Sequence, residues 1–155
     1  MPPAEKRTGS TRFDPMWLLL VAAALFLGRV GLGVWERYHP VPKAEKVRWV
    51  PYDDAGAVAA VTGRPILYDF SAEWCEPCQA MAEGVFADEA KAKTLEGAVV
   101  PVRVLDRVRE EGANPAWVDS LQREWSVDGF PTLVVYSPKT GRSQVSTGYG
   151  GPDRT

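Results

Sequence analysis

An uninterrupted apolar run near the N-terminus places the strongest constraint on this chain. Residues 16–35 read MWLLLVAAALFLGRVGLGVW, and Arg29 is the single charged residue among these twenty positions. A helix rises about 1.5 Å per residue, so a run of this length can cross the roughly 30 Å hydrocarbon layer of a bilayer. Arg29 lies close enough to the end of the run for its side chain to reach the interface. The run therefore predicts one transmembrane helix.

A cleaved signal peptide and a buried core helix are the alternative interpretations of this run. A signal peptide ends in a small-x-small cleavage site, whereas the alanines at 22–24 lie in the middle of the run and its end contains Arg29. We therefore expect an uncleaved anchor that follows a short basic segment, residues 1–15. Basic residues lie on both sides of the run, so their count does not decide its orientation. The short basic N-terminus favours an anchor with its N-terminus inside the cytoplasm and the following domain outside.

The remainder of the chain has room for one compact domain. Residues 36–155 carry 14 of the 18 Lys and Arg residues and 18 of the 20 Asp and Glu residues, a net charge of −4. This acidic balance gives no broad attraction to nucleic acid. We expect a short, stiff tether over residues 36–50, where Pro40 and Pro42 lie among mixed charges, and one folded domain over residues 51–155.

Capping and turn residues predict that helices alternate with strands in this domain. Asp53 or Asp54 is expected to cap the first helix and Gly63 to end it, while Asp88 caps a later helix that Gly97 ends. The last two strands are close enough to pair as an antiparallel hairpin. This order predicts an α/β sandwich around a mixed sheet. The expected helices cover residues 55–62, 75–84, 88–95 and 115–125, and the expected strands cover 66–71, 98–105 (apolar except Arg103), 132–136 and 142–147.

The chemistry of the chain is concentrated in residues 74–78, WCEPC, which contain its two cysteines. Cysteines three positions apart across the first turn of a helix lie within disulfide reach, and the helix N-terminus stabilises a thiolate on the first. We therefore expect Cys75 to be the nucleophile and Cys78, the better buried of the two, to attack the resulting mixed disulfide. Pro77 suits the first turn of a helix, where its missing N–H costs nothing.

A metal site and an inert structural disulfide are the alternative interpretations of this pair. His39 is the single histidine and there is no further cysteine, so the usual four-ligand zinc site cannot form. We expect no metal and no organic cofactor, although two thiolates can bind copper. Redox activity is favoured because the pair follows an expected strand and opens an expected helix.

Two separated motifs of this chain resemble the thioredoxin family. They are residues 66–78, ILYDFSAEWCEPC, and residues 129–132, GFPT. Residues 63–65, GRP, and 85–88, VFAD, are further similar to the C-terminal thioredoxin-like domain of bacterial DsbD-type thiol:disulfide interchange proteins. The resemblance covers roughly residues 49–149. It implies a thioredoxin-like fold, with helices on both sides of a mixed central sheet, and dithiol–disulfide exchange.

The resemblance also implies roles for individual residues. Cys75 and Cys78 would form the redox-active disulfide, with Cys75 attacking and Cys78 resolving. Pro131 would be a cis-proline that faces this disulfide, and the backbone of Phe130 would bind a substrate segment. Asp69 would be the family's buried carboxylate, whose raised pKa lets it accept the proton of Cys78, although a purely structural carboxylate is the alternative. The other expected substrate contacts are Trp74, Glu76 and Pro77.

The sequence around the cysteines is acidic, which bears on the direction of the reaction. Residues 69–89 contain six acidic residues and no Lys or Arg. A solvated helix face explains such a pattern, but Glu73 and Glu76 beside Cys75 would also disfavour its thiolate and make the dithiol more reducing. We therefore expect a reductase of disulfide-containing client proteins, supplied by a membrane or thioredoxin-like electron donor.

This interpretation places the protein in a bacterial inner membrane with a periplasmic domain. An oxidase or isomerase of the same fold, a non-catalytic membrane-anchored binding or assembly module, and a copper thiol chaperone are the alternatives. The chain also departs from the family at two places. The segment of residues 106–115 is longer and more polar than the corresponding segment of minimal thioredoxins. It is interpreted either as a loop that contacts a partner or as an uninformative insertion. The family's terminal helix is expected to be missing after residues 142–147, which would expose an apolar face of the sheet.

Overall fold

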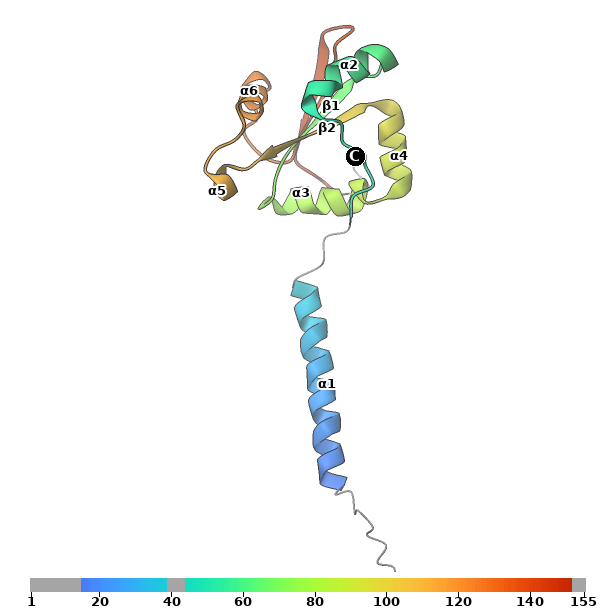
Figure 1. Cartoon of the computed structure of the whole chain (residues 1–155), viewed down its shortest axis with the longest axis vertical. Helices are drawn as coiled ribbons and strands as arrows, with labels where there is room; N and C mark the ends of the chain where they lie inside the picture. The colour runs from blue at the N-terminus through green and yellow to red at the C-terminus, as the bar shows by residue number, and fades with distance from the viewer. Residues whose placement is uncertain (1–14, 39–43, 152–155) are drawn as a thin grey trace, which may run out of the picture. The chain divides into compact units, whose positions relative to one another are not determined.

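The computed structural model describes residues 15–38 and 44–151. The chain divides into two compact units, and every element except the first helix belongs to the second unit (Figure 1). The first helix, α1 (Pro15–Tyr38), contains the expected apolar run. Its segment Met16–Val34 is long and apolar enough to cross a membrane, and none of this segment is buried. A soluble helix normally buries an apolar stripe, so a helix that is apolar and exposed all round fits a candidate membrane span.

The second unit is built on one mixed sheet of four strands in the order β2-β1-β3-β4. Strand β1 pairs parallel with β2 and antiparallel with β3, and β3 pairs antiparallel with β4. The expected α/β sandwich with a terminal hairpin is therefore confirmed. The strands are β1 (Ile66–Ala72), β2 (Val100–Asp106), β3 (Thr132–Ser137) and β4 (Arg142–Thr147).

Helices cover the two faces of this sheet with separate hydrophobic clusters. Tyr68, Phe70 and Val134 pack in one cluster with residues of α2 and α6, whereas Leu133 packs in the other with residues of η1 and α4. Neighbouring residues of a strand point to opposite faces, so Asp69 lies on the face away from Tyr68 and Phe70. The helical segments are α2 (Tyr52–Thr62), α3 (Glu76–Met81), the π-helix η1 (Ala82–Phe86), α4 (Glu89–Ala98), α5 (Val108–Glu111) and α6 (Ala116–Glu124).

Local capping signals located some helix ends correctly and others wrongly. Gly63 ends α2 in the left-handed conformation (φ 69°), and Asp88 caps α4 by accepting a hydrogen bond from the backbone N–H of Lys91 at 3.0 Å. The expected caps Asp53 and Asp54 are wrong, because α2 begins at Tyr52 after Pro51, and both carboxylates lie in its first turn. Acidic side chains still stabilise that turn through the helix dipole.

Two expected helix ends at glycines are also wrong. The helix that follows Cys75 does not break at Gly84, because the chain continues there as η1 and buries Phe86. Gly97 does not end α4, which runs to Ala98 and leaves β2 to begin at Val100 instead of residue 98. A glycine permits a break without enforcing one, and at Gly84 the continued helical chain buries Phe86.

The last part of the expected tether is packed against the domain. Residues 44–50, which we call the docked segment, bury Val47 in the cluster that contains Phe86. The backbone N–H of Lys46 donates to the carbonyl of Phe86 at 2.7 Å, and that of Val50 donates to the carbonyl of Pro101 at 2.8 Å. The preceding tether residues 39–43, including His39, lie outside the described residues.

The hairpin formed by β3 and β4 lies at the open edge of the sheet. All six residues of β4 are exposed, and in the part of the chain that the structure describes no helix follows this strand. The expected loop over residues 106–115 contains the short helix α5, which the sequence did not predict.

Substitution of Phe86→Ala tests the packing of the face that contains Asp69. Phe86 is 2% exposed, so removing its ring should lower the free energy of unfolding of the domain by about 3 to 5 kcal/mol. Phe26→Ala is the matched control, since Phe26 lies in α1 and is 69% exposed. Denaturant unfolding of the full chain in detergent micelles measures both. Equal stability of the two variants would contradict this account of the core.

Candidate active site

Cys75 and Cys78 form a disulfide at the start of α3, with their Cα atoms 5.2 Å apart. Cys75 is the N-cap of α3, and its sulfur accepts a hydrogen bond from the backbone N–H of Cys78 at 3.2 Å. Pro77 lies in the first turn, where a missing N–H leaves no carbonyl without its partner. The sulfur of Cys75 is therefore at the positive end of the helix dipole, which stabilises a thiolate after reduction.

The two cysteines are about equally buried in this disulfide form. Cys75 is 3% exposed and Cys78 is 6% exposed, so the expectation that Cys78 is the better buried is wrong. Both pack with Ala72 and with the side chain of Phe130, which covers this small cluster. The difference between the two sulfurs therefore lies in their positions on α3, since only Cys75 caps the helix.

Aromatic side chains lie beside the disulfide. Trp74 is 44% exposed, and its ring meets that of Phe130 edge to face with the centroids 5.9 Å apart. The peptide bond between Phe130 and Pro131 is cis. Thr132, the next residue, starts β3 and donates its hydroxyl to the carbonyl of Gly129 at 2.8 Å. The two motifs that the sequence separates thus meet around one disulfide.

Helix α5 brings basic side chains to this acidic surface, which the sequence analysis did not foresee. The guanidinium carbon of Arg109 lies 4.0 Å from the centroid of the Trp74 ring, and Arg107 forms an ion pair with Glu73 at 3.5 Å. The charge of Glu73 is therefore partly balanced, whereas Glu76 and Pro77 are exposed in the first turn of α3. The unusual length of the segment 106–115 was the sequence feature that could have indicated that its arginines contribute to the site.

Asp69 is fully buried on β1, and one cation lies against it. The Nε atom of Arg103 is 2.9 Å from Oδ2 of Asp69, and the two residues are opposite each other in the parallel pairing of β1 with β2. Burial raises the pKa of Asp69 from 3.8 to about 6, while Arg103 acts to lower it and Glu45 to raise it. The expected raised pKa is therefore confirmed, but the surroundings are not purely apolar. Arg103 was visible in the sequence as the one charge in an apolar strand.

Glu45 and Trp49 complete the surroundings of this ion pair from the docked segment. Arg103 donates from Nη1 to Oε1 of Glu45 at 2.9 Å, and its guanidinium carbon lies 4.1 Å from the centroid of the Trp49 ring. Sequence analysis missed both residues because it assigned them to a tether. Among the residues that the structure describes, no group of three or more His, Cys, Asp or Glu side chains is arranged to hold a metal ion.

A disulfide that starts the helix after an interior strand of such a mixed sheet is the arrangement of the thioredoxin fold. Residues 52–154 match the family model of the thioredoxin-like domain, and the chain belongs to this family.

Relatives and a solved structure agree with this assignment. The chain is 34% identical over 125 residues to the thiol:disulfide interchange protein TxlA homolog of Synechocystis sp., covering 80% of this chain and 61% of that protein. It is 28% identical over 125 residues to the thiol:disulfide interchange protein DsbD of Yersinia enterocolitica, covering 76% of this chain and 20% of that protein. The solution structure of a thioredoxin from Thermus thermophilus has a TM-score of 0.52 and 32% identity, covering 68% and 76% of the two chains. The chain thus spans less than two thirds of the length of these two curated relatives.

The buried carboxylate predicts a pH dependence of stability. Between pH 3.8 and about 6 the folded state keeps a proton on Asp69 that the unfolded state has lost, so stability falls as pH rises through this window. The fall should amount to about 3 kcal/mol, at roughly 1.4 kcal/mol for each pKa unit. Asp69→Asn should remove this component and leave a flatter profile. Denaturant unfolding of the oxidised full chain between pH 4 and about 8 measures it, and identical profiles for the two proteins would contradict the raised pKa.

Proposed function

We propose that this chain is a membrane-anchored protein-disulfide reductase whose Cys75 and Cys78 exchange a dithiol for disulfides in extracytoplasmic client proteins. The observation that carries the proposal is the disulfide at the N-terminus of α3, a helix whose Met81 packs in the same cluster as Leu133, the residue opposite the buried carboxylate Asp69. The family membership supports thiol–disulfide exchange.

The reaction needs two successive exchanges between sulfurs. In the reduced protein the Cys75 thiolate attacks a client disulfide, which forms a mixed disulfide and releases the first client sulfur as a thiolate. Cys78 then loses its proton and attacks the sulfur of Cys75, which releases the second client sulfur. The client gains two electrons and the protein becomes the Cys75–Cys78 disulfide, the form seen in the structure. An electron donor, a membrane or thioredoxin-like redox protein, returns the dithiol.

Asp69 is the proposed acceptor of the proton of Cys78. With a pKa of about 6, this carboxyl group is largely ionised at neutral pH and still basic enough to accept a proton, directly or through water. An ordinary exposed aspartate would be a weaker base, so burial is what suits Asp69 to the role.

The surface beside Cys75 is the proposed contact with the client. Trp74 is exposed and packs on Phe130, whose side chain packs against the disulfide cluster. The guanidinium of Arg109 lies over the Trp74 ring and adds a positive charge to this surface. A client segment that lies across Trp74, Glu76 and Pro77 would meet both aromatic and acidic groups.

The reducing direction is proposed from the charges around α3. Glu76 lies in the first turn of α3, where a negative charge opposes the stabilisation of a Cys75 thiolate. A destabilised thiolate makes the dithiol more reducing.

The candidate span of α1 supports a membrane anchor, and the short basic N-terminus supports an inner-membrane protein with its domain in the periplasm.

Trapping of intermediates tests the exchange mechanism. Cys78→Ser should accumulate mixed disulfides through Cys75 in native membranes, because the second exchange is blocked, and a non-reducing gel detects them. Cys75→Ser and the double substitution are matched controls that should trap far less. Full function of the double variant would instead support a non-catalytic docking module.

A redox titration of the full chain in glutathione buffers tests the direction. We expect a potential nearer to about −270 mV than to about −120 mV, the values of thioredoxin and of a strong oxidant. Glu76→Gln should raise the potential, since it removes the charge that opposes the thiolate, whereas Glu83→Gln, in η1, is the control. A wild-type value above about −170 mV would favour an oxidase or isomerase.

A further inference from the structure

The docked segment supplies the environment of Asp69 with a second carboxylate. Oε1 of Glu45 accepts a hydrogen bond from Nη1 of Arg103 at 2.9 Å, and Nε of the same guanidinium lies 2.9 Å from Oδ2 of Asp69. One cation is therefore shared between a buried carboxylate and a half-buried one. The three groups come from three separate parts of the chain, β1, β2 and the docked segment.

Trp49 fixes Glu45 in this arrangement. Its indole N–H donates to Oε2 of Glu45 at 2.7 Å, so both oxygens of that carboxylate have partners. The Trp49 ring covers the guanidinium of Arg103 and meets the ring of Phe86 edge to face, with centroids 5.0 Å apart. Aromatic cover of this kind shields the ion pairs from water and keeps the guanidinium in place.

A guanidinium that is shared between two carboxylates stabilises each of them less than one that is committed to a single partner. We propose that Glu45 is a positioning residue for the thiol–disulfide reaction, because it draws Arg103 partly away from Asp69 and so keeps Asp69 able to accept the proton of Cys78. The inference rests on the proton-accepting role proposed for Asp69 above. Glu45 precedes the part of the chain that matches the family, so a residue outside that match tunes the basicity of Asp69.

The charges around Asp69 agree with this assignment. Arg103 lowers and Glu45 raises the pKa of Asp69, and both effects act against a background of strong burial. Of the other elements on this face, β3 carries no charged residue, and Glu76 of α3 and Glu83 of η1 are exposed. Helix α4 carries Glu89, Lys91 and Lys93, which are exposed, and Glu96, which pairs with Arg48, while Tyr149 packs in the same cluster with its hydroxyl buried. Glu45 is therefore the acidic group whose removal should change the ionisation of Asp69.

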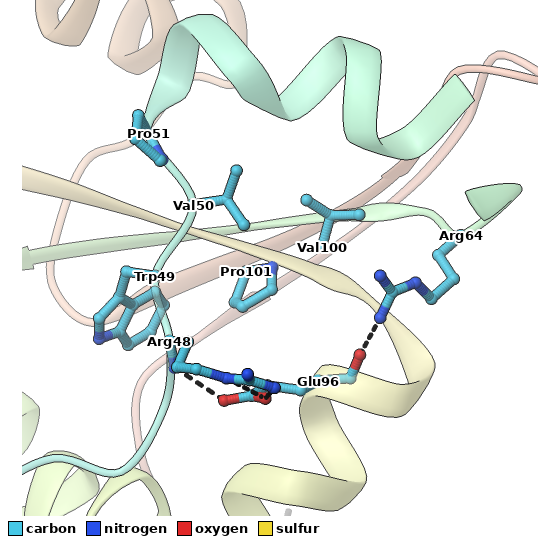
Figure 2. Close-up of a pocket in the computed structure, with 8 residues that line it drawn as sticks. All are labelled: Arg48, Trp49, Val50, Pro51, Arg64, Glu96, Val100 and Pro101. Carbon is cyan, nitrogen blue, oxygen red and sulfur yellow. Dashed lines mark hydrogen bonds and ion pairs between the residues drawn. The ribbon is translucent and has the colours of Figure 1, made fainter. Parts of the chain in front are cut away.

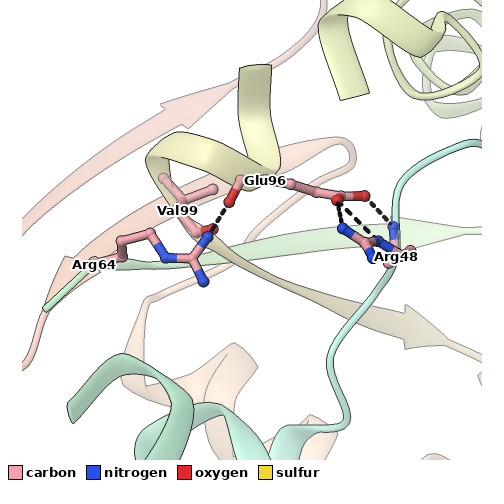
Figure 3. Close-up of polar contacts among 4 residues, drawn as sticks. All are labelled: Arg48, Arg64, Glu96 and Val99. Atoms are coloured by element: carbon pink, nitrogen blue, oxygen red, sulfur yellow. Dashed lines mark hydrogen bonds and ion pairs between the residues drawn. The ribbon is translucent and has the colours of Figure 1, made fainter. Parts of the chain in front are cut away.

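A purely structural role of Glu45 can be separated from this one, because a second ion pair anchors the same segment. Glu96 of α4 accepts hydrogen bonds from the backbone N–H of Arg48 at 2.8 Å and from its Nε and Nη2 atoms at 3.0 and 2.6 Å (Figure 3). These groups line a pocket together with Trp49, Arg64 and Pro101 (Figure 2). The charges that shift the pKa of Asp69 are those of Arg103 and Glu45, whereas Glu96 is paired with Arg48. Glu96→Gln therefore loosens the segment without changing the charge beside Arg103.

The test compares Glu45→Gln, Glu45→Asp and Glu96→Gln in the oxidised full chain in detergent micelles. Carbon-13 NMR of the aspartate carboxyl groups follows the titration of Asp69, whose signal is assigned by its loss in Asp69→Asn. Glu45→Gln should lower the pKa of Asp69, by less than the roughly one to three pH units that a charge in direct contact produces. Glu45→Asp keeps the charge and should stay nearer to the wild type, and Glu96→Gln should titrate like the wild type.

Two results would overturn the inference. One is an unchanged titration of Asp69 in Glu45→Gln, and the other is an equal shift in Glu96→Gln, which would mean that the segment acts only by being anchored. The oxidised protein needs no client for this measurement, so failure of the proposed reductase function is recognised separately, as absence of trapped mixed disulfides. In the reduced protein, the pH profile of the resolving step should move to lower pH in Glu45→Gln and stay in place in Glu96→Gln.

Discussion

The complete burial of β1 is the constraint on which the site depends. All seven of its residues are buried, so its alternate side chains must suit two different surroundings. Tyr68 and Phe70 fill one hydrophobic cluster, and Asp69 is carried to the other face, where Arg103 meets it. The strand ends at Ala72, whose carbonyl accepts a hydrogen bond from the backbone N–H of Cys75 at 3.1 Å. One buried strand thus fixes both the carboxylate and the start of the helix that holds the disulfide.

Most of the fold was predictable, because its signals are local in the sequence. The apolar run, the alternating elements and the Gly63 and Asp88 caps depend on the chemistry of a few neighbouring residues. The error at Gly84 has a physical cause, whereas the helix end expected at Gly97 is displaced only to Ala98. A glycine lowers the free-energy cost of a helix break, but burial of Phe86 stabilises the continued helical chain. Whether a side chain is buried depends on residues that are distant in the sequence.

The residues of the site also divide into those that local sequence signals identify and those that depend on distant segments. Cys75 and Cys78 were identified from their spacing and from the strand and helix expected around them, and Asp69 from the resemblance of residues 66–78 to the thioredoxin family. The partners of Asp69 could not be identified in this way. Arg103 faces it through the register of two strands, and Glu45 reaches Arg103 across 58 positions of the chain. Contacts of that kind follow from how the completed fold brings distant segments together.

The docked segment lies outside the part of the chain that matches the family, yet it contributes to the surroundings of Asp69. The match to the family begins at residue 52, after the whole of that segment. A fragment cut at that boundary would keep both cysteines and Asp69, but Arg103 would lose Glu45, its other carboxylate partner among the described residues. Such a fragment would also lose Val47 and Trp49 from the hydrophobic cluster on that face, so the part of the chain that determines the surroundings of Asp69 is longer than the part that matches the family.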